Sequence, residues 1–527
     1  MQKIFFSILT FSVFAASCST DLLDRGPLDK YSEQNVWKDS TLINLYVGNI
    51  YAGIRSTYDE GGDWLMACIT DEGESARTFH LSQQINSGQY GPSDNVYSPY
   101  WTGCYTQARK CNTLLERVPE APLSDALRTR MTGEAYFLRA LAYMQLYDRF
   151  GRFPIIDKVL SLEDETTIPR AKDEDCVKFI LADLDKAASL LPPSYNSANL
   201  GRATSWAAIA LKSRFLLNQH RDTEAAAAAW AVIDSKKYIL FGDFLTLFNP
   251  ENDNNTEIIF DKQYASGISG QTHSLDTYEN SPFFTGFSSA ITCPTQNLVD
   301  AFKMKDGLAW DQSPLYNAAK PYDNRDPRFY ATVLYDGYQW MNETVDMKKG
   351  SKFNRASGSG SSPTGYFLRK FLNPKFDTKV NNNNANFQNC PVIRLAEIYL
   401  VYAEAKWNLG EKEEARTYVN KLRTRAKMPE IEAADFTFTS LQNERFVELA
   451  FEGQRWFDIK RWNEGPQKIG VKITGVDIQD KPEGRTYTRF DVETRFFQPK
   501  MYLFPIPLSE INKYPAGTPL EQNPNWN

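Results

Sequence analysis

Paired stretches of helical periodicity are the feature that most limits how this chain can fold. Between residues 393 and 409, apolar side chains recur at alternating spacings of three and four, which places them on one face of a helix: Leu395, Ile398, Tyr402, Ala405 and Leu409. Gly410 follows at the position where a left-handed residue ends a helix. A second helix is predicted over 413–426, so 393–426 is expected to form a helical hairpin.

Two earlier parts of the chain show the same organisation. Residues 134–147 are predicted to be helical, and Gly151 and Pro154 stop the pattern. Segments 203–218 and 224–234 form a second pair, whose alanines allow two helices to approach closely. Helix pairs of this size are typical of tetratricopeptide units, which repeat at about 34 residues.

The helical pattern is lost between residues 241 and 390. Gly, Asn, Ser and Pro interrupt this region, for example at 357–363 and 381–384. It is also rich in aromatic residues, namely Tyr278, Phe283, Phe284, Phe287, Trp310, Tyr316, Tyr338 and Trp340. Rings that face solvent on loops can stack on sugars or on peptide side chains. Most of these rings are nevertheless expected to pack the loops onto the helices.

The N-terminus has the pattern of an export signal that ends at a cysteine. Lys3 precedes an apolar run over 4–16, and Ala15, Ala16 and Ser17 stand directly before Cys18. This pattern predicts a signal peptide over 1–17, lipidation of Cys18 and a short polar tether over 18–30. With more than one acyl chain, at about 0.8 kcal/mol for each buried methylene, anchoring would be stable. The alternative is an ordinary secretory signal with a cysteine there by chance.

Composition argues against several classes of protein. The net charge is -6, and no basic tract suited to nucleic acid is present. The six cysteines after Cys18 have no C-x-x-C spacing, so neither a disulfide framework nor a zinc site is expected. The three histidines lack metal-ligand spacing, and no nucleophile elbow, phosphate-binding loop or dinucleotide fingerprint occurs. We therefore expect no catalytic residues, no metal and no cofactor.

The densest charged cluster lies over residues 444–462. Glu444, Glu448 and Glu452 are four apart, and three pairs of opposite charge are spaced i,i+3: Arg445–Glu448, Glu452–Arg455 and Asp458–Arg461. Paired carboxylates can serve glycoside hydrolysis or hold a di-iron centre. The Glu-x-x-His motif of di-iron proteins is missing, and arginines alternate with the acids. We expect a structural ion-pair network that locks this helix to its neighbours.

Several of these segments together resemble one family, the SusD/RagB nutrient-binding lipoproteins of the Bacteroidetes outer membrane. The matching stretches are NERFVELAFEGQRWFDIKRW at 443–462, 394–426, the closing 502–526, 134–154, 201–217 and NRDPRFY at 324–330. The resemblance implies a mainly α fold, in which tetratricopeptide-like helix pairs form an α-α superhelix against a loop-rich lobe with little β structure. It also implies a lipid-anchored protein on the cell surface that captures a glycan, or in some members peptides. A SusC-like TonB-dependent transporter would be the partner and would receive the nutrient.

The expected organisation is one compact unit built from successive parts: helices over 31–240, a ligand-facing insertion over 241–390, completing helices over 391–463 and an irregular segment over 464–527. The resemblance does not fix the ligand residues, but the loops at 60–101 and 275–316 are the candidates by position. We select five possible ligand residues in them: Arg77, Trp101, Tyr278, Phe284 and Trp310. For Trp101 the alternative is a buried anchor of the following helix, and for Arg77 a surface ion pair. Two rival functions remain, a lipid-anchored glycoside hydrolase and an adhesive surface protein.

Overall fold

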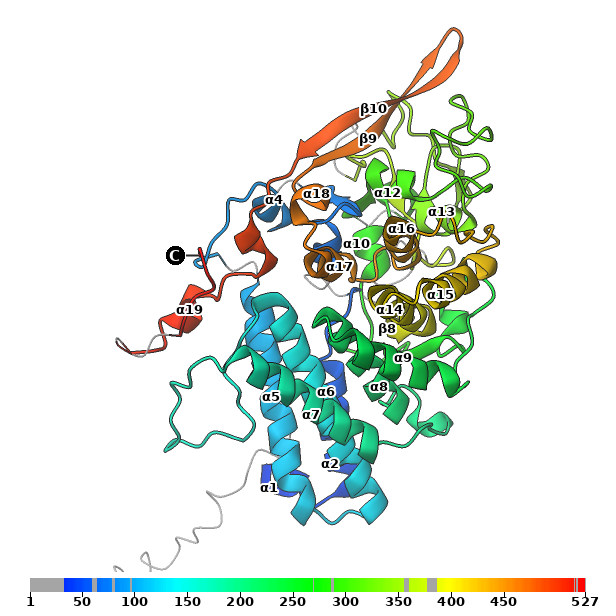
Figure 1. Cartoon of the computed structure of the whole chain (residues 1–527). Helices are drawn as coiled ribbons and strands as arrows, with labels where there is room; N and C mark the ends of the chain where they lie inside the picture. The colour runs from blue at the N-terminus through cyan, green and yellow to red at the C-terminus, as the bar shows by residue number, and fades with distance from the viewer. Residues whose placement is uncertain are drawn as a thin grey trace, which may run out of the picture.

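The computed structural model describes residues 33–58, 64–77, 81–94, 97–268, 270–285, 289–354, 360–376, 386–515, 517 and 520–526. The predicted signal peptide, Cys18 and its tether, as well as Phe287, lie outside these described residues. Figure 1 shows a stack of long helices beside a lobe dominated by loops.

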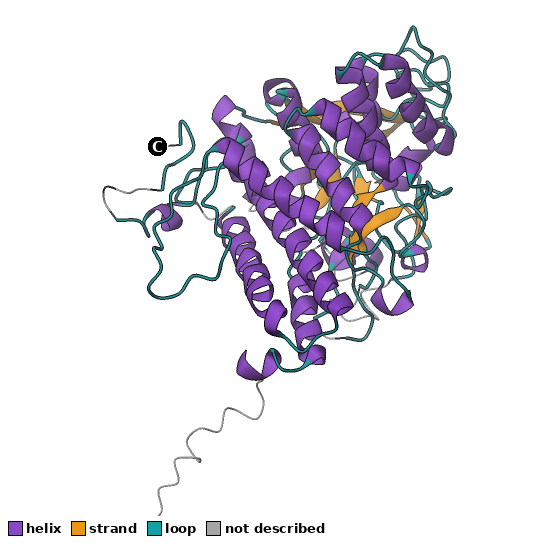
Figure 2. Ribbon diagram, turned by 60° about the horizontal axis from the view of Figure 1, so that its bottom comes forward, coloured by secondary structure: helices purple, strands orange, loops and turns teal. Residues whose placement is uncertain are grey.

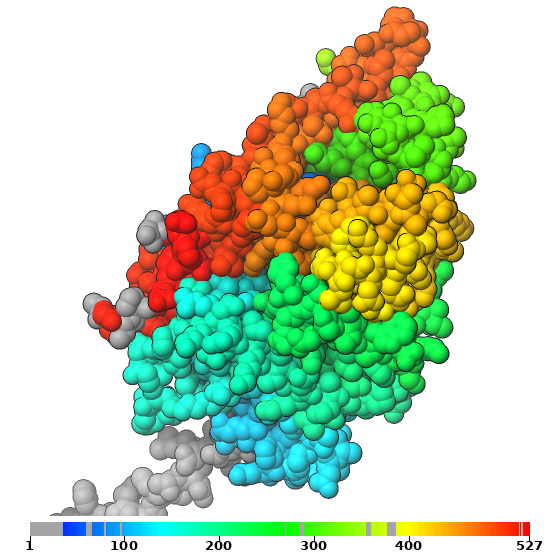
Figure 3. Space-filling view, in the orientation of Figure 1, coloured from blue at the N-terminus to red at the C-terminus, as the bar shows by residue number. Residues whose placement is uncertain are grey.

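The helical part is built from long helices, most of which pack against the helix that precedes them in the chain. They are α2 (Ser40–Ala52), α5 (Ser98–Arg117), α6 (Asp125–Phe150), α7 (Asp173–Leu190), α8 (Ser205–Asn218), α9 (Asp222–Asp234), α14 (Leu395–Asn408), α15 (Lys412–Arg425), α16 (Phe438–Glu448) and α17 (Arg455–Trp462). α14 packs against α9, so the stack resumes after the loop-rich insertion. In Figure 3, the 391–463 segment accordingly lies against the α8–α9 region.

Local sequence explains where these helices end. α6 stops at Gly151, whose φ of 69° is left-handed, and α14 is followed by Gly410 with φ of 85°. The helices α8 and α9 pack against each other, and six of their alanines are buried: Ala207, Ala208, Ala210, Ala225, Ala226 and Ala229. The predicted helix pairs and their stop signals are confirmed.

Shorter helices occur mainly in the second lobe and in connecting segments: α1 (Glu33–Val36), α3 (Trp64–Ala67), α4 (Leu81–Asn86), α10 (Leu275–Glu279), α11 (Pro282–Thr285), α12 (Gln296–Ala301), α13 (Pro327–Thr332), α18 (Gly465–Lys468) and α19 (Leu508–Ile511). The described strands pair only in antiparallel twos: β1 (Gly73–Ser75) with β3 (Thr292–Pro294), β2 (Ile258–Lys262) with β8 (Cys390–Arg394), β4 (Val333–Leu334) with β7 (Phe367–Leu368), β5 (Gln339–Trp340) with β6 (Glu343–Thr344), and β9 (Lys472–Lys481) with β10 (Gly484–Thr494). Figure 2 shows these strands as minor elements beside the helices, which confirms the predicted fold class.

The β9–β10 hairpin corrects the expectation that 464–527 is irregular. Ile473, Val476 and Ile478 are buried on β9, while much of β10 stays exposed, so only one strand carries a clear apolar pattern. Gly484 begins β10 with a φ of 129° after the tight turn. The hairpin projects from the loop-rich lobe (Figure 1). Its base rests on that lobe through the Val476 amide, which donates to the Thr364 carbonyl at 2.8 Å.

Each of the two parts has its own apolar core. One buried cluster fills the helical stack, with Phe137, Phe150 and Phe215 among its members. A second cluster lies under the loops and includes Phe329 and Phe367. Aromatic side chains pack the loop-rich lobe, as expected for most rings in that region.

Candidate functional site

A short antiparallel ladder brings together the two segments that the sequence singles out for ligand binding. β1 belongs to the 60–101 segment and β3 to the 275–316 segment, and the two strands pair along their whole length. One further bond extends the ladder, from the Ala76 amide to the Ile291 carbonyl at 2.8 Å. Two segments that are far apart in the sequence therefore lie side by side.

Arg77 and Tyr278 meet at the end of this ladder. The Arg77 guanidinium donates from Nη2 to Ser289 Oγ at 2.8 Å, and its carbon lies 5.9 Å from the centroid of the Tyr278 ring. Tyr278 is positioned by α10 and by its carbonyl, which accepts from the Ile291 amide at 2.9 Å. All three side chains, those of Arg77, Tyr278 and Ser289, are half-buried. We call these three residues the Arg77–Tyr278 face.

The buried carboxyl group of Glu279 lies next to this face and helps to hold it in place. Glu279 accepts from the Thr292 amide at 2.8 Å and from the Thr292 hydroxyl at 3.1 Å. Burial raises the pKa of Glu279 to about 7, whereas the bonds from Thr292 and the charge of Arg77 act in the opposite direction. Glu279 thereby fixes the end of α10, next to Tyr278, on the β3 strand.

The other three selected residues lie elsewhere. Phe284 is 8% exposed and stacks on Phe353 with ring centroids 4.9 Å apart. Trp310 is half-buried beside the hairpin, with the Arg489 guanidinium 4.0 Å above its ring. The structure therefore joins only Arg77 and Tyr278 by direct contact among the five.

Trp101 has the role given as its alternative in the sequence analysis, that of a buried anchor of the following helix. It lies in the first turn of α5, is 3% exposed and packs edge-on against Phe150 at 5.3 Å. Its ring belongs to the core of the helical stack. We do not carry Trp101 or Phe284 into the proposal, because a ring enclosed by protein offers no face to a ligand in this structure.

Sequence reasoning missed Ser289 and Glu279. Glu279 could have been found, because it directly follows Tyr278, which the sequence did single out. Ser289 had none, because its partner Arg77 is 212 residues away and only the β1–β3 ladder brings the two together.

Comparison with known proteins agrees with this architecture. The family model described as the SusD family matches residues 256–526, just over half of the chain. A second, described as "Starch-binding associating with outer membrane", matches residues 28–217. This chain belongs to the SusD family.

Relatives of this SusD-family chain cover nearly its whole length. The structure of a SusD-like protein from Bacteroides fragilis is 30% identical, with a TM-score of 0.84 over 95% of this chain and 100% of that one. A SusD-like carbohydrate binding protein from the same organism is 25% identical, with a TM-score of 0.81 over 90% of this chain and 98% of that one. SusD-like protein P25 of Formosa agariphila is 22% identical over 550 residues, covering 97% of this chain and 96% of the relative. The resemblance seen in the sequence is confirmed.

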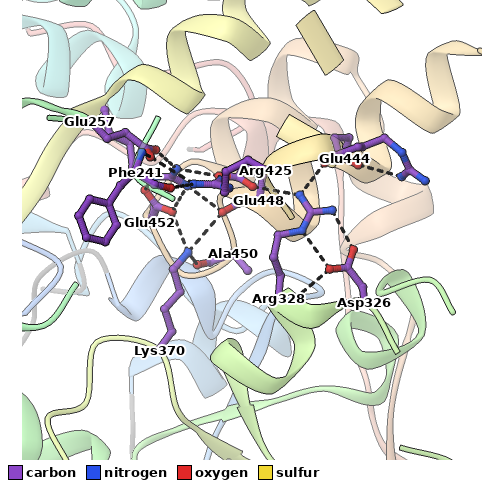
Figure 4. A network of polar contacts seen from close by, with 12 residues as sticks. Phe241, Glu257, Asp326, Arg328, Lys370, Arg425, Glu444, Glu448, Ala450 and Glu452 are labelled. Carbon is purple, nitrogen blue, oxygen red and sulfur yellow. Dashed lines mark hydrogen bonds and ion pairs between the residues drawn. The ribbon is translucent and has the colours of Figure 1, made fainter. Parts of the chain in front are cut away.

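The acidic cluster of this SusD-family chain forms a buried ion-pair network (Figure 4). Five cations face five carboxylates: Arg328, Lys370, Arg394, Arg423 and Arg425 against Glu257, Asp326, Glu444, Glu448 and Glu452. The network connects α15 and α16 of the scaffold to α13 and the segment after β7 in the loop-rich lobe. The predicted structural role is confirmed.

The pairing within this cluster differs from the i,i+3 scheme. Only Asp458–Arg461 forms as expected, at 2.9 Å. Arg445 reaches Asp458 instead, at 2.7 Å, and Arg455 pairs with Asp71 at 2.7 Å. For Glu452–Arg455 the reason is that 444–462 is two helices, α16 and α17, separated by a turn in which Phe451 has φ of 64°. Arg445 and Glu448 both lie on α16, but each pairs with a residue of another element instead.

The remaining chemistry of the described residues is plain. Cys68, Cys104, Cys111, Cys176, Cys293 and Cys390 are buried free thiols. Within the described part of the chain, no group of His, Cys, Asp or Glu has the arrangement of a metal site. Nor does any helix there have the length and apolar character needed to cross a membrane.

Proposed function

We propose that this protein is a surface-exposed lipoprotein that binds an oligosaccharide at the Arg77–Tyr278 face. It captures the nutrient and delivers it to a SusC-like TonB-dependent transporter in the outer membrane. It acts by binding and not as an enzyme. The observation that carries the proposal is the β1–β3 ladder, which places a half-buried guanidinium beside a half-buried ring.

The chemistry of this face suits a sugar. A tyrosine ring supplies a flat apolar surface for the C–H face of a pyranose. A guanidinium supplies several N–H donors in a fixed plane, which can reach ring hydroxyls beside the stacked sugar. A solved relative at 25% identity is described as carbohydrate binding, which supports the same ligand class. Trp310 is retained as a candidate for an outer subsite, because it is half-buried on the same lobe.

Isothermal titration against a panel of glycans tests the ligand class. Binding is expected to strengthen with chain length, because each further ring adds contacts to a shallow face. A heat of binding with peptides, and none with any carbohydrate, would instead support the alternative that the protein binds peptides. Release of reducing ends during the titration, abolished by a Glu→Gln change in a cleft, would establish a hydrolase.

Two further experiments test the proposed lipid anchor and the proposed transporter partner. Replacing Cys18 by alanine is expected to release the protein from intact cells, as followed by surface labelling and palmitate incorporation. Retention of the C18A variant on the cell surface would refute the lipid anchor. Co-purification from outer membranes is expected to recover a TonB-dependent transporter, and its absence, with no growth defect on any nutrient after gene loss, would favour an adhesive role.

A further inference from the structure

A cavity of about 480 Å³ lies in the helical stack, away from the Arg77–Tyr278 face. It is bounded by the end of α2, the first half of α5 and the middle of α6, together with one residue of β2. These three helices pack against one another. Its volume falls within the roughly 300–1,000 Å³ of small-molecule sites. We call it the α5–α6 cavity.

The walls of the α5–α6 cavity are largely apolar. Ile54 from the segment directly after α2, and Leu138, Leu141 and Ala142 from α6, line it. The α6 residues lie at spacings of three and four, so they form one continuous strip of that helix. Such a strip offers a surface of the kind on which the C–H face of a pyranose can pack.

The charged residues that line the cavity are both cations, Arg55 and Lys262. No aspartate or glutamate is among its described lining residues. Arg55 is held in place because it donates to the Pro99 carbonyl at 2.6 Å and lies 4.1 Å above the Tyr100 ring. The lining is therefore complementary to a negative charge.

Two amide side chains add hydrogen-bonding capacity. Gln107 and Gln145 both line the cavity, from α5 and α6 respectively. The Gln107 Oε1 atom is buried and has no hydrogen-bond partner among the described residues. The Gln107 amide nitrogen lies only 1.4 Å from where a Cβ of Gly53 would stand, so the glycine makes room for this side chain. A buried acceptor without a donor is unfavourable, and a ligand hydroxyl would satisfy it.

We propose that the α5–α6 cavity is a second ligand site, which binds a sugar acid of one or two residues. The carboxylate would be paired with Arg55 and Lys262, a hydroxyl would donate to Gln107, and the apolar ring face would pack on α6. This site uses different elements from the Arg77–Tyr278 face, so it does not depend on the proposed function. It would give the protein a specificity for acidic glycans or their fragments in addition to its main ligand.

Titration calorimetry with D-galacturonate, and with D-galactose as the neutral match, tests the proposal on the full-length protein. Galacturonate is expected to bind at least about tenfold more tightly than galactose, because only the acid forms charge-assisted hydrogen bonds. K262M is expected to weaken galacturonate binding about tenfold. R109M removes an exposed cation of α5 outside the lining and is expected to change nothing.

A blocking variant keeps the test independent of charge. Thr106 is exposed on α5 and lines the cavity, so T106W fills the space without entering the core. It should abolish galacturonate binding and leave oligosaccharide binding at the Arg77–Tyr278 face unchanged, with an unaltered circular dichroism spectrum. Equal affinity for the acid and the neutral sugar, no binding of either, or wild-type binding by T106W would each overturn the proposal.

Discussion

Replacing Glu448 by glutamine is expected to destabilise the protein strongly, because this residue joins three guanidinium groups in the interior. Glu448 is 0% exposed. Its carboxylate accepts from Arg394 at 2.7 Å, from Arg328 at 3.0 Å and from Arg425. Glutamine keeps the shape but removes the charge, and its amide turns a donor toward donors. Breaking a buried ion pair from one side costs about 3–5 kcal/mol.

Urea unfolding followed by circular dichroism measures this loss. With a slope of about 3 kcal/mol per molar urea, E448Q is expected to lower the unfolding midpoint by about 1–1.7 M. The matched control is E224Q, which removes a half-exposed i,i+3 partner of Arg221 and is expected to cost at most about 0.5 kcal/mol. If E448Q unfolded within about 0.2 M of E224Q, the network would not hold the two parts together as argued.

The pH dependence provides a second check on the same residue. Burial alone would raise the pKa of Glu448, but the guanidinium groups of Arg425, Arg394 and Arg328 hold it well below its usual range. A carboxyl group with a lowered pKa stabilises the folded state above its unfolded pKa, and this contribution is lost as the pH falls toward the folded value. E448Q should therefore unfold with a weaker dependence on acid pH than the wild type.

Three further predictions follow from individual residues. Y278A is expected to weaken oligosaccharide binding about tenfold, or about 1.4 kcal/mol, as measured by calorimetry. The control W230A removes a 41% exposed ring of α9 and should leave the affinity unchanged. Equal losses of affinity in the two variants would place the ligand elsewhere. Burial raises the pKa of Glu72 from 4.5 to about 8, so the folded state holds that proton more tightly and stability should fall as the pH rises through this window. E72Q should flatten the urea midpoint between about pH 5 and about pH 8, and an unchanged slope would contradict the assignment. G365A places a Cβ 2.6 Å from the Val476 carbonyl oxygen at a backbone φ of 84°, so it should lower the thermal unfolding midpoint. In G337A the φ is 92° but the space around the new Cβ is open, so this variant carries the backbone strain alone. It should therefore lower the midpoint less than G365A.

Part of the fold follows from local sequence. The helices around Gly151 and Gly410 end where a residue without a Cβ takes a left-handed conformation, and such a signal can be read without knowing any neighbour. The β9–β10 hairpin could not be read in this way. β10 has little apolar alternation and is held by its pairing to β9, which is itself bonded to the lobe through Val476 and Thr364.

The candidate site, too, is only partly predictable from local sequence. Aromatic loops and the positions of Arg77 and Tyr278 are visible in the sequence, but the pairing of these two residues is not. It requires β1 and β3 to form a ladder between segments far apart in the chain. The burial of Trp101 was equally hidden, because a tryptophan in the first turn of a helix can face either the core or solvent.

The sequence by itself determined the helix pairs, their stops and the kinship with the SusD family, since all three depend on patterns within short segments. The tertiary structure alone decided which charges pair, which rings stay accessible and where a cavity opens between α2, α5 and α6. The physical reason is that an ion pair or a buried ring is defined by its neighbours in space. Arg394, for example, contacts Glu257 and Glu452, which lie 137 and 58 residues away in the chain.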